Sequence, residues 1–81
     1  IRAREMMEIH CYPNPTQDKI YITGLTERSF VSIYDINGKR IASQQIFTQH
    51  ATFDMSAYQN GIYVIEIKNS TQKYTKKIVK K

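Results

Sequence analysis

The feature that most constrains the fold is a rhythm of short apolar runs separated by turn-forming residues. From Ile9 onward the runs alternate apolar with polar side chains, and Gly, Pro and Asn stand between them. A period of two is typical of half-buried β-strands, whereas an amphipathic helix repeats every three to four residues. The sequence therefore predicts an all-β fold with no long helix.

Seven short strands are expected along the chain. They cover residues 8–12, 19–23, 29–36, 39–47, 51–55, 62–68 and 73–80. Residues 54–59 favour a helical turn between the fifth and sixth strands, with Asp54 or Ser56 as its cap. The sixth strand is apolar on one face and partly apolar on the other, which is typical of a central strand. Two packed sheets would bury these faces, so we expect a small immunoglobulin-like antiparallel β-sandwich of about seven strands.

Two local signals shape the connections between these strands. Asn37-Gly38 favours a two-residue hairpin turn with positive φ angles, which would join residues 29–36 to residues 39–47. In the second of these strands Ile41 and Ile46 fall on opposite faces. A bulge or a break near residues 43–45 would reconcile them.

The chain is long enough for one domain, and its charge is unevenly placed. It has 81 residues, of which 41% are apolar, and a formal charge of +5. Residues 1–72 hold equal numbers of basic and acidic side chains, so the whole excess lies in residues 73–81. A nucleic-acid-binding domain is expected to have a broader basic surface, and no run is apolar enough for a membrane helix. We therefore expect neither nucleic-acid binding nor direct membrane insertion.

The residues that could bind metal or perform catalysis do not form a recognisable site. The candidates are His10, Cys11, His50 and Asp54. Neighbouring strand residues point to opposite faces, and the spacing fits no zinc motif. A cysteine–histidine pair would also need a third, orienting group, which is not evident. We expect no metal, no cofactor and no enzymatic activity.

The aromatic residues have a simple structural interpretation. Tyr21, Tyr34, Tyr63 and Tyr74 all lie in expected strands. Packing between the sheets, with hydroxyls at the rim, would account for most of them, although a face that stacks ligands is the alternative.

The last strand is open to two interpretations. Its lysines could protect an exposed sheet edge from aggregation. Alternatively, a partner could add a strand to this edge, with the lysines steering the domain towards an acidic surface.

Several motifs together resemble a known family. Tyr12-Pro13-Asn14-Pro15 follows the first strand, and VSIYDINGKRI occupies residues 31–41. FDMSAYQNGIYVIEI and KKIVKK follow at residues 53–67 and 76–81. In order and spacing these segments resemble the C-terminal sorting domain of cargo proteins of the bacterial type IX secretion system. The resemblance extends over residues 9–81.

This resemblance implies a function. Such a domain is joined to an upstream cargo domain, here through a linker in residues 1–8, and the whole chain is expected to be part of a larger protein. The domain directs the cargo from the periplasm through an outer-membrane translocon to the cell surface or medium. A surface sortase typically removes it. An adhesin or a carbohydrate- or protein-binding accessory module is the alternative function for a sandwich of this kind.

The resemblance also assigns residues. The terminal motif, which would be read by the translocon, comprises Lys76, Lys77, Ile78, Val79, Lys80 and Lys81. The structural motifs of the family correspond to Pro13, Asn14, Pro15, Gly38, Gly61, Ile62 and Tyr63. From the residues alone, Gly61 and Tyr63 are expected to serve folding, through a positive φ angle and through core packing.

Overall fold

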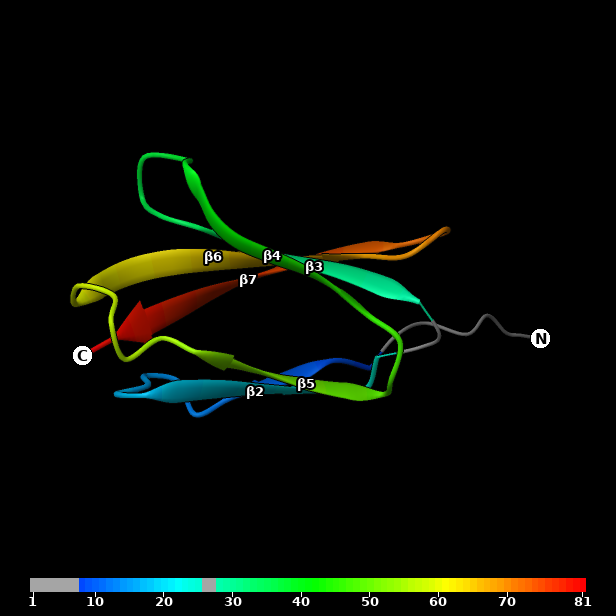
Figure 1. Ribbon diagram of the computed structural model, residues 1–81, viewed down its shortest axis with the longest axis horizontal. Coiled ribbons are helices and arrows are strands. Elements are labelled where there is room, and N and C mark those ends of the chain that lie inside the picture. Colours follow the sequence, from blue (N-terminus) through cyan, green and yellow to red (C-terminus); the bar gives the residue numbers. More distant parts are fainter. Residues whose placement is uncertain (1–7, 26–27) are drawn as a thin grey trace.

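The chain folds into a sandwich of two antiparallel β-sheets, which confirms the predicted all-β class (Figure 1). The computed structural model describes residues 8–25 and 28–81. The linker expected at residues 1–8 lies outside this part, apart from Glu8, which is exposed. The strands are β1 (His10–Tyr12), β2 (Lys19–Thr23), β3 (Ser29–Tyr34), β4 (Arg40–Ile46), β5 (His50–Asp54), β6 (Gly61–Lys68) and β7 (Lys73–Lys80).

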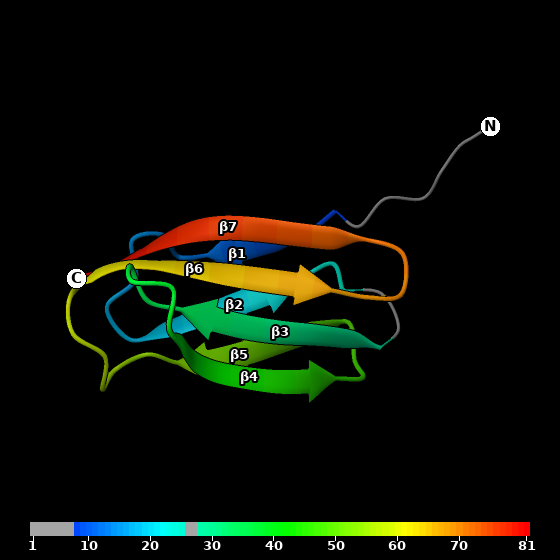
Figure 2. The ribbon, with the colours of Figure 1, turned by 90° about the horizontal axis from the view of Figure 1, so that it is seen from above.

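One sheet has three strands in the order β1-β2-β5, and the other has four in the order β4-β3-β6-β7. Figure 2 shows the four-stranded sheet in front of the three-stranded one, with β7 along the same side as β1. The chain changes sheet after β2, β4 and β5, as in immunoglobulin-like sandwiches. Since β6 pairs with both β3 and β7, the prediction of a central sixth strand is confirmed.

The core lies between the sheets and follows the alternation in the sequence. In β6 the side chains of Tyr63, Ile65 and Ile67 are buried, whereas Ile62, Val64 and Glu66 on the other face are exposed or half-buried. Each fully buried isoleucine contributes roughly 1.5–3 kcal/mol through the hydrophobic effect. The side chains with no exposure at all are Ile20, Ile22, Val31, Ile33, Met55, Ile65, Ile67 and Ile78.

The Asn-Gly hairpin is present, but its turn differs from the predicted one. Gly38 donates its N–H to the carbonyl of Asp35 at 3.0 Å, which makes Ile36 and Asn37 the central residues of the turn. Gly38 has a φ of 84°, and no residue other than glycine has a positive φ in the described part. The connection is therefore a three-residue loop with glycine in the left-handed position, not a two-residue turn. The Asp35 carboxylate stabilises it by accepting the N–H groups of Asn37 and Lys39, each at 2.9 Å.

The bulge in β4 lies earlier than predicted. The register shifts where Tyr34 pairs with Arg40 and Ile33 pairs with Ala42, so Ile41 is the extra residue. The break expected near residues 43–45 was therefore misplaced. The shift next to the turn brings Ile46 to the core face, where it is 8% exposed, and leaves Ile41 half-buried beside the core.

The helical turn predicted at residues 54–59 is wrong. Tyr58 donates its N–H to the carbonyl of Met55 at 3.0 Å, which forms a single tight turn after β5. Asp54 caps this turn, since its carboxylate accepts the Ser56 N–H at 2.9 Å. Hydrogen bonds from the side chain and the backbone N–H of Ser56 lower the pKa of the Asp54 carboxyl group. The turn comprises only residues 56–58, which is too short a stretch to form a stable helix.

The tyrosines divide between the core and the outer faces. Tyr63 is buried and Tyr74 packs partly against the core, as expected. Tyr21, however, lies on the outer face of its sheet, 40% exposed, with its ring 5.8 Å from that of Tyr12. Tyr34 also faces outward and donates its hydroxyl to the Glu66 carboxylate at 3.3 Å. The expectation that tyrosines pack between the sheets therefore fails for Tyr21 and Tyr34, because both follow the outward phase of their strands.

Candidate recognition site

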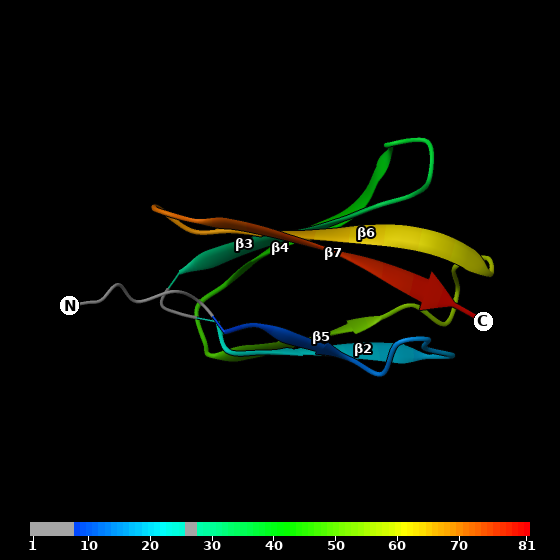
Figure 3. The same ribbon diagram turned by 180° about the vertical axis from the view of Figure 1, so that it is seen from behind.

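The sequence motifs converge at one end of the sandwich. β1, β3, β5 and β7 all finish there, and β2, β4 and β6 all begin there. We name this end the C-terminal pole and define it by residues 13–18, 35–39 and 55–60 with Lys81. Figures 1 and 3 show its loops grouped around the C-terminus. Gly38 and the proline motif lie within it, and Gly61 borders it at the start of β6.

The proline motif is fastened to the last strand by the side chain of Asn14. The Asn14 amide nitrogen donates to the Lys77 carbonyl at 3.0 Å. Its amide oxygen accepts the Val79 N–H, also at 3.0 Å. The side chain thus occupies the place that the backbone of a neighbouring strand would take. Both X–Pro bonds of this motif, before Pro13 and before Pro15, are cis.

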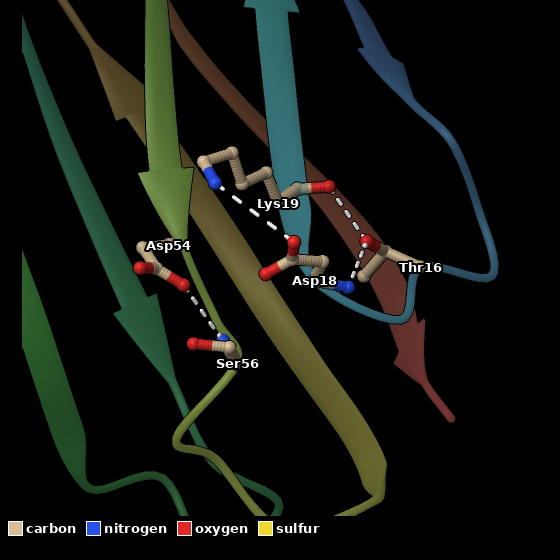
Figure 4. Close-up of polar contacts among 5 residues, drawn as sticks. All are labelled: Thr16, Asp18, Lys19, Asp54 and Ser56. Carbon is tan, nitrogen blue, oxygen red and sulfur yellow. Dashed lines mark hydrogen bonds and ion pairs between the residues drawn. The ribbon is translucent and has the colours of Figure 1, made fainter.

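Thr16 continues the attachment with its backbone. Its N–H donates to the Val79 carbonyl and its carbonyl accepts the Lys81 N–H, both at 2.8 Å. The Thr16 side chain is 1% exposed, and its hydroxyl donates to the Lys19 carbonyl at 2.6 Å and accepts the Asp18 N–H at 3.3 Å (Figure 4). We call these contacts of Asn14 and Thr16 the terminal clamp. Thr16 was missed by the sequence analysis.

Sequence signals point to the two clamp residues only in part. The Asn14 side chain makes one hydrogen bond with its amide nitrogen and one with its amide oxygen, and such a role produces no periodic pattern in the sequence. A threonine after Pro-Asn-Pro does favour a local turn, because its hydroxyl can bond the backbone two residues on.

The six residues of the terminal motif differ in burial. Lys76, Lys77 and Lys81 are exposed, and we call them the terminal lysines. Ile78 has no exposure and Lys80 is 6% exposed. The Lys80 ammonium reaches the Asn60 side-chain oxygen at 3.5 Å. Val79 is half-buried, and its backbone belongs to the terminal clamp.

The terminal lysines carry uncompensated charge. Among residues 8–25 and 28–81, the ion pairs are Lys19 with Asp18 at 3.8 Å and Lys73 with Glu66 at 3.6 Å. No carboxylate of the described residues lies within 4.0 Å of a terminal lysine ammonium. Three positive charges, two within β7 and one just after it, therefore have no carboxylate partner in this part of the chain.

The glycine-aromatic motif supports the pole from inside. Gly61 has a φ of 153° and opens β6, as expected for a glycine required by the backbone. Tyr63 is 8% exposed and donates its hydroxyl to the Gln59 carbonyl at 2.6 Å. Its ring lies 5.6 Å from that of Tyr58. Ile62 is 40% exposed and pairs in register with Val79 on the outer face.

The metal and catalytic candidates remain dispersed in the structure. His10 and His50 are exposed and both lie in register with Thr23, while Cys11 is half-buried. Burial raises the pKa of the Cys11 thiol, an effect that the nearby Lys76 ammonium partly opposes. In the part of the chain that the structure describes, no three His, Cys, Asp or Glu side chains gather as metal ligands. The same part contains no helix of the length and apolarity needed to cross a membrane.

Asn14 should contribute measurably to stability through the terminal clamp. Asn14→Ala removes both hydrogen bonds to β7, and we expect a loss of about 1–3 kcal/mol in unfolding free energy. Asn14→Asp keeps the acceptor for the Val79 N–H but sets a carboxylate oxygen against the Lys77 carbonyl in place of the donor, so it should also destabilise the domain. Urea unfolding of the three chains measures both losses. Equal stability of wild type and Asn14→Ala would show that the clamp is not stabilising.

The fold and this site define a class of protein: a small β-sandwich whose distinctive residues hold and surround its last strand. The chain matches the family of secretion system C-terminal sorting domains over residues 10–81, and it belongs to that family. A search of curated proteins gave no significant match. The chain is therefore a sorting signal for type IX secretion, and it is part of a cargo that is exported to the cell surface or secreted. This family is not catalytic, and the match favours sorting over an adhesin or accessory-module function.

Proposed function

We propose that the type IX translocon reads the terminal lysines on the folded domain. The observation that carries this proposal is the division of the terminal motif. Lys76, Lys77 and Lys81 are exposed and lack an ion-pair partner among the described residues, whereas Ile78 and Lys80 are buried. On this proposal the lysines contact an acidic surface, and the two buried residues hold β7 in place. The opposite charges of the terminal lysines and of this acidic surface would also speed the encounter between the domain and the translocon.

The proline and glycine-aromatic motifs have an indirect role in this proposal. Pro13, Asn14 and Pro15 position the end of β7 through the terminal clamp. Gly38 closes the β3–β4 hairpin, and Gly61, Ile62 and Tyr63 form the start of the strand that pairs with β7. These residues therefore act by shaping the pole. Residues 9–81 would form the sorting domain and residues 1–8 its linker to the cargo.

The remaining steps of export are proposed from the same family membership. The cargo passes through the periplasm before it reaches the translocon, and a surface sortase then separates it from this domain. Glu8, two residues before β1, is exposed, so a cut at this residue would be accessible to such an enzyme. No nucleic acid, cofactor or metal takes part in this function.

A reporter fusion tests the sorting function directly. The chain is fused behind a periplasmic reporter in a bacterium with this secretion system. Removing residues 76–81 should leave the reporter in the periplasm, because it eliminates the terminal lysines and more than half of β7. Fractionation and surface labelling measure the distribution of the reporter. Normal surface display of the truncated fusion would refute the proposal.

A further inference from the structure

Among residues 8–25 and 28–81, β7 is an edge strand whose outer side is only half covered. It pairs with β6 on its inner side, and the terminal clamp covers its outer side from Lys77 to Lys81. The clamp segment runs parallel to β7, with Thr16 opposite Lys80. The cover ends at the Lys77 carbonyl, so the first half of the strand continues beyond it as an edge.

The hydrogen-bonding direction of each residue in β7 follows from the clamp. Alternate residues of a strand direct their N–H and C=O groups to opposite sides. Val79 directs both groups outward to the clamp, and the pairing with β6 runs without a shift from Lys80 to Lys73. Lys73, Thr75 and Lys77 therefore also direct their backbone groups outward.

These outward groups are available to a partner. Among residues 8–25 and 28–81, no hydrogen bond engages the N–H or C=O of Thr75 or the N–H of Lys77. The side chains of Lys73, Thr75, Lys76 and Lys77 are all exposed. The backbone of a neighbouring extended segment could therefore approach this edge, as in recognition by strand addition.

Charge selects the kind of segment that fits. Lys73, Lys76 and Lys77 flank the open edge, and Glu66, which lies opposite Thr75 in β6, is already paired with Lys73. A second copy of the chain would place lysines against lysines, which is the known way to protect an edge strand. An acidic strand would instead place its carboxylates beside these ammonium groups. Cross-strand pairs of opposite charge each contribute roughly 0.2–1 kcal/mol.

We propose that the outer edge of β7 from Lys73 to Lys77 accepts an extended acidic segment of the translocon as an added strand. This inference rests on the proposed sorting function and specifies its partner. The open backbone groups supply affinity, and the lysines select carboxylates. The added strand must end at Lys77, because the carbonyl of this residue already accepts a hydrogen bond from Asn14 in the terminal clamp.

A proline at position 75 separates strand addition from simple charge attraction. The Thr75 N–H points away from β6, so Thr75→Pro keeps the ladder between β6 and β7 and leaves every lysine in place. It removes the central donor of the edge and puts the proline ring in the path of an added strand. Thr75→Val is the matched control, because it keeps the donor and has a similar volume.

The binding probe is a short synthetic peptide that alternates glutamate with valine, titrated into the 81-residue chain. The wild type and Thr75→Val should bind it, and the Thr75 and Lys77 amides should become protected from hydrogen exchange. Thr75→Pro should reduce the affinity by about tenfold or more. A peptide with lysine in place of glutamate should not bind. Equal affinity of Thr75→Pro, or binding without amide protection, would overturn the inference, as would self-association of the free chain through this edge.

Reporter export distinguishes this inference from the sorting function itself. If the wild-type fusion is not exported, the sorting function fails. If the wild type and Thr75→Pro are exported equally well, the sorting function stands and strand addition at this edge is refuted. Export of wild type and Thr75→Val, with Thr75→Pro retained in the periplasm although folded, is the expected result.

Discussion

Ile78→Ala is expected to lower the unfolding free energy by about 2–5 kcal/mol, the usual cost of truncating a buried isoleucine. Ile78 has no solvent exposure and lies opposite Tyr63 of the central strand β6. A domain of this size has a total stability on the order of 5–15 kcal/mol, so the loss is a large part of it. Urea unfolding followed by circular dichroism measures the change.

Val79→Ala is the matched control for Ile78→Ala. Val79 is the next residue of the same strand, but it is half-buried and belongs to the outer face. Its contribution to the clamp comes from its backbone, which alanine retains. The cost at position 79 should therefore be well below that at position 78. Similar losses at both positions would mean that the end of β7 is not fixed in the orientation described.

The alternation of the sequence was sufficient to predict most of the sandwich. β2 and β7 begin and end where the pattern predicted, and β6 differs by one residue at its start. Alternation succeeds because a strand with one buried face must place its apolar residues two apart. It also places Lys80 on the same face as Ile78, and the structure follows this period despite the charge, since the ammonium reaches Asn60.

The turns were predicted less well, because competing local geometries have similar sequences. Asn-Gly is compatible with both two-residue and three-residue hairpin loops, and the carboxylate of Asp35 stabilises the longer one here. Likewise, Asp54 caps a single tight turn as readily as it would begin a helix. The bulge at Ile41 follows from this turn, so an error in the turn also displaced the bulge.

The geometry of the candidate site was beyond sequence reasoning for a different reason. Asn14 and Lys77 are 63 residues apart, and nothing local to either residue indicates the other. The family resemblance identified both motifs, but not that one holds the other. β1 and β7 run along the same side of the two sheets (Figure 2), and the segment after β1 crosses to the edge of β7, where Thr16 lies opposite Lys80. Thr16 acts mainly through its backbone, which a pattern of side chains does not reveal.

Reversing the charge of all three terminal lysines should abolish most export while the domain stays folded. Lys76→Glu, Lys77→Glu and Lys81→Glu together replace attraction to an acidic surface by repulsion. Each lost contact is worth up to about 1 kcal/mol, so three together should reduce export by about tenfold or more. The side chains are exposed, so the unfolding free energy should change by less than about 1 kcal/mol. Reporter display and urea unfolding measure the two effects.

The most direct test of the account compares this variant with a charge-matched one. Arg28→Glu, Arg40→Glu and Lys68→Glu change the net charge by the same amount at exposed positions outside β7 and outside the C-terminal pole. We expect the reporter to reach the cell surface with this control and to remain in the periplasm when the terminal lysines are reversed. Equal display of the two variants, both folded, would contradict the claim that the translocon reads the terminal lysines.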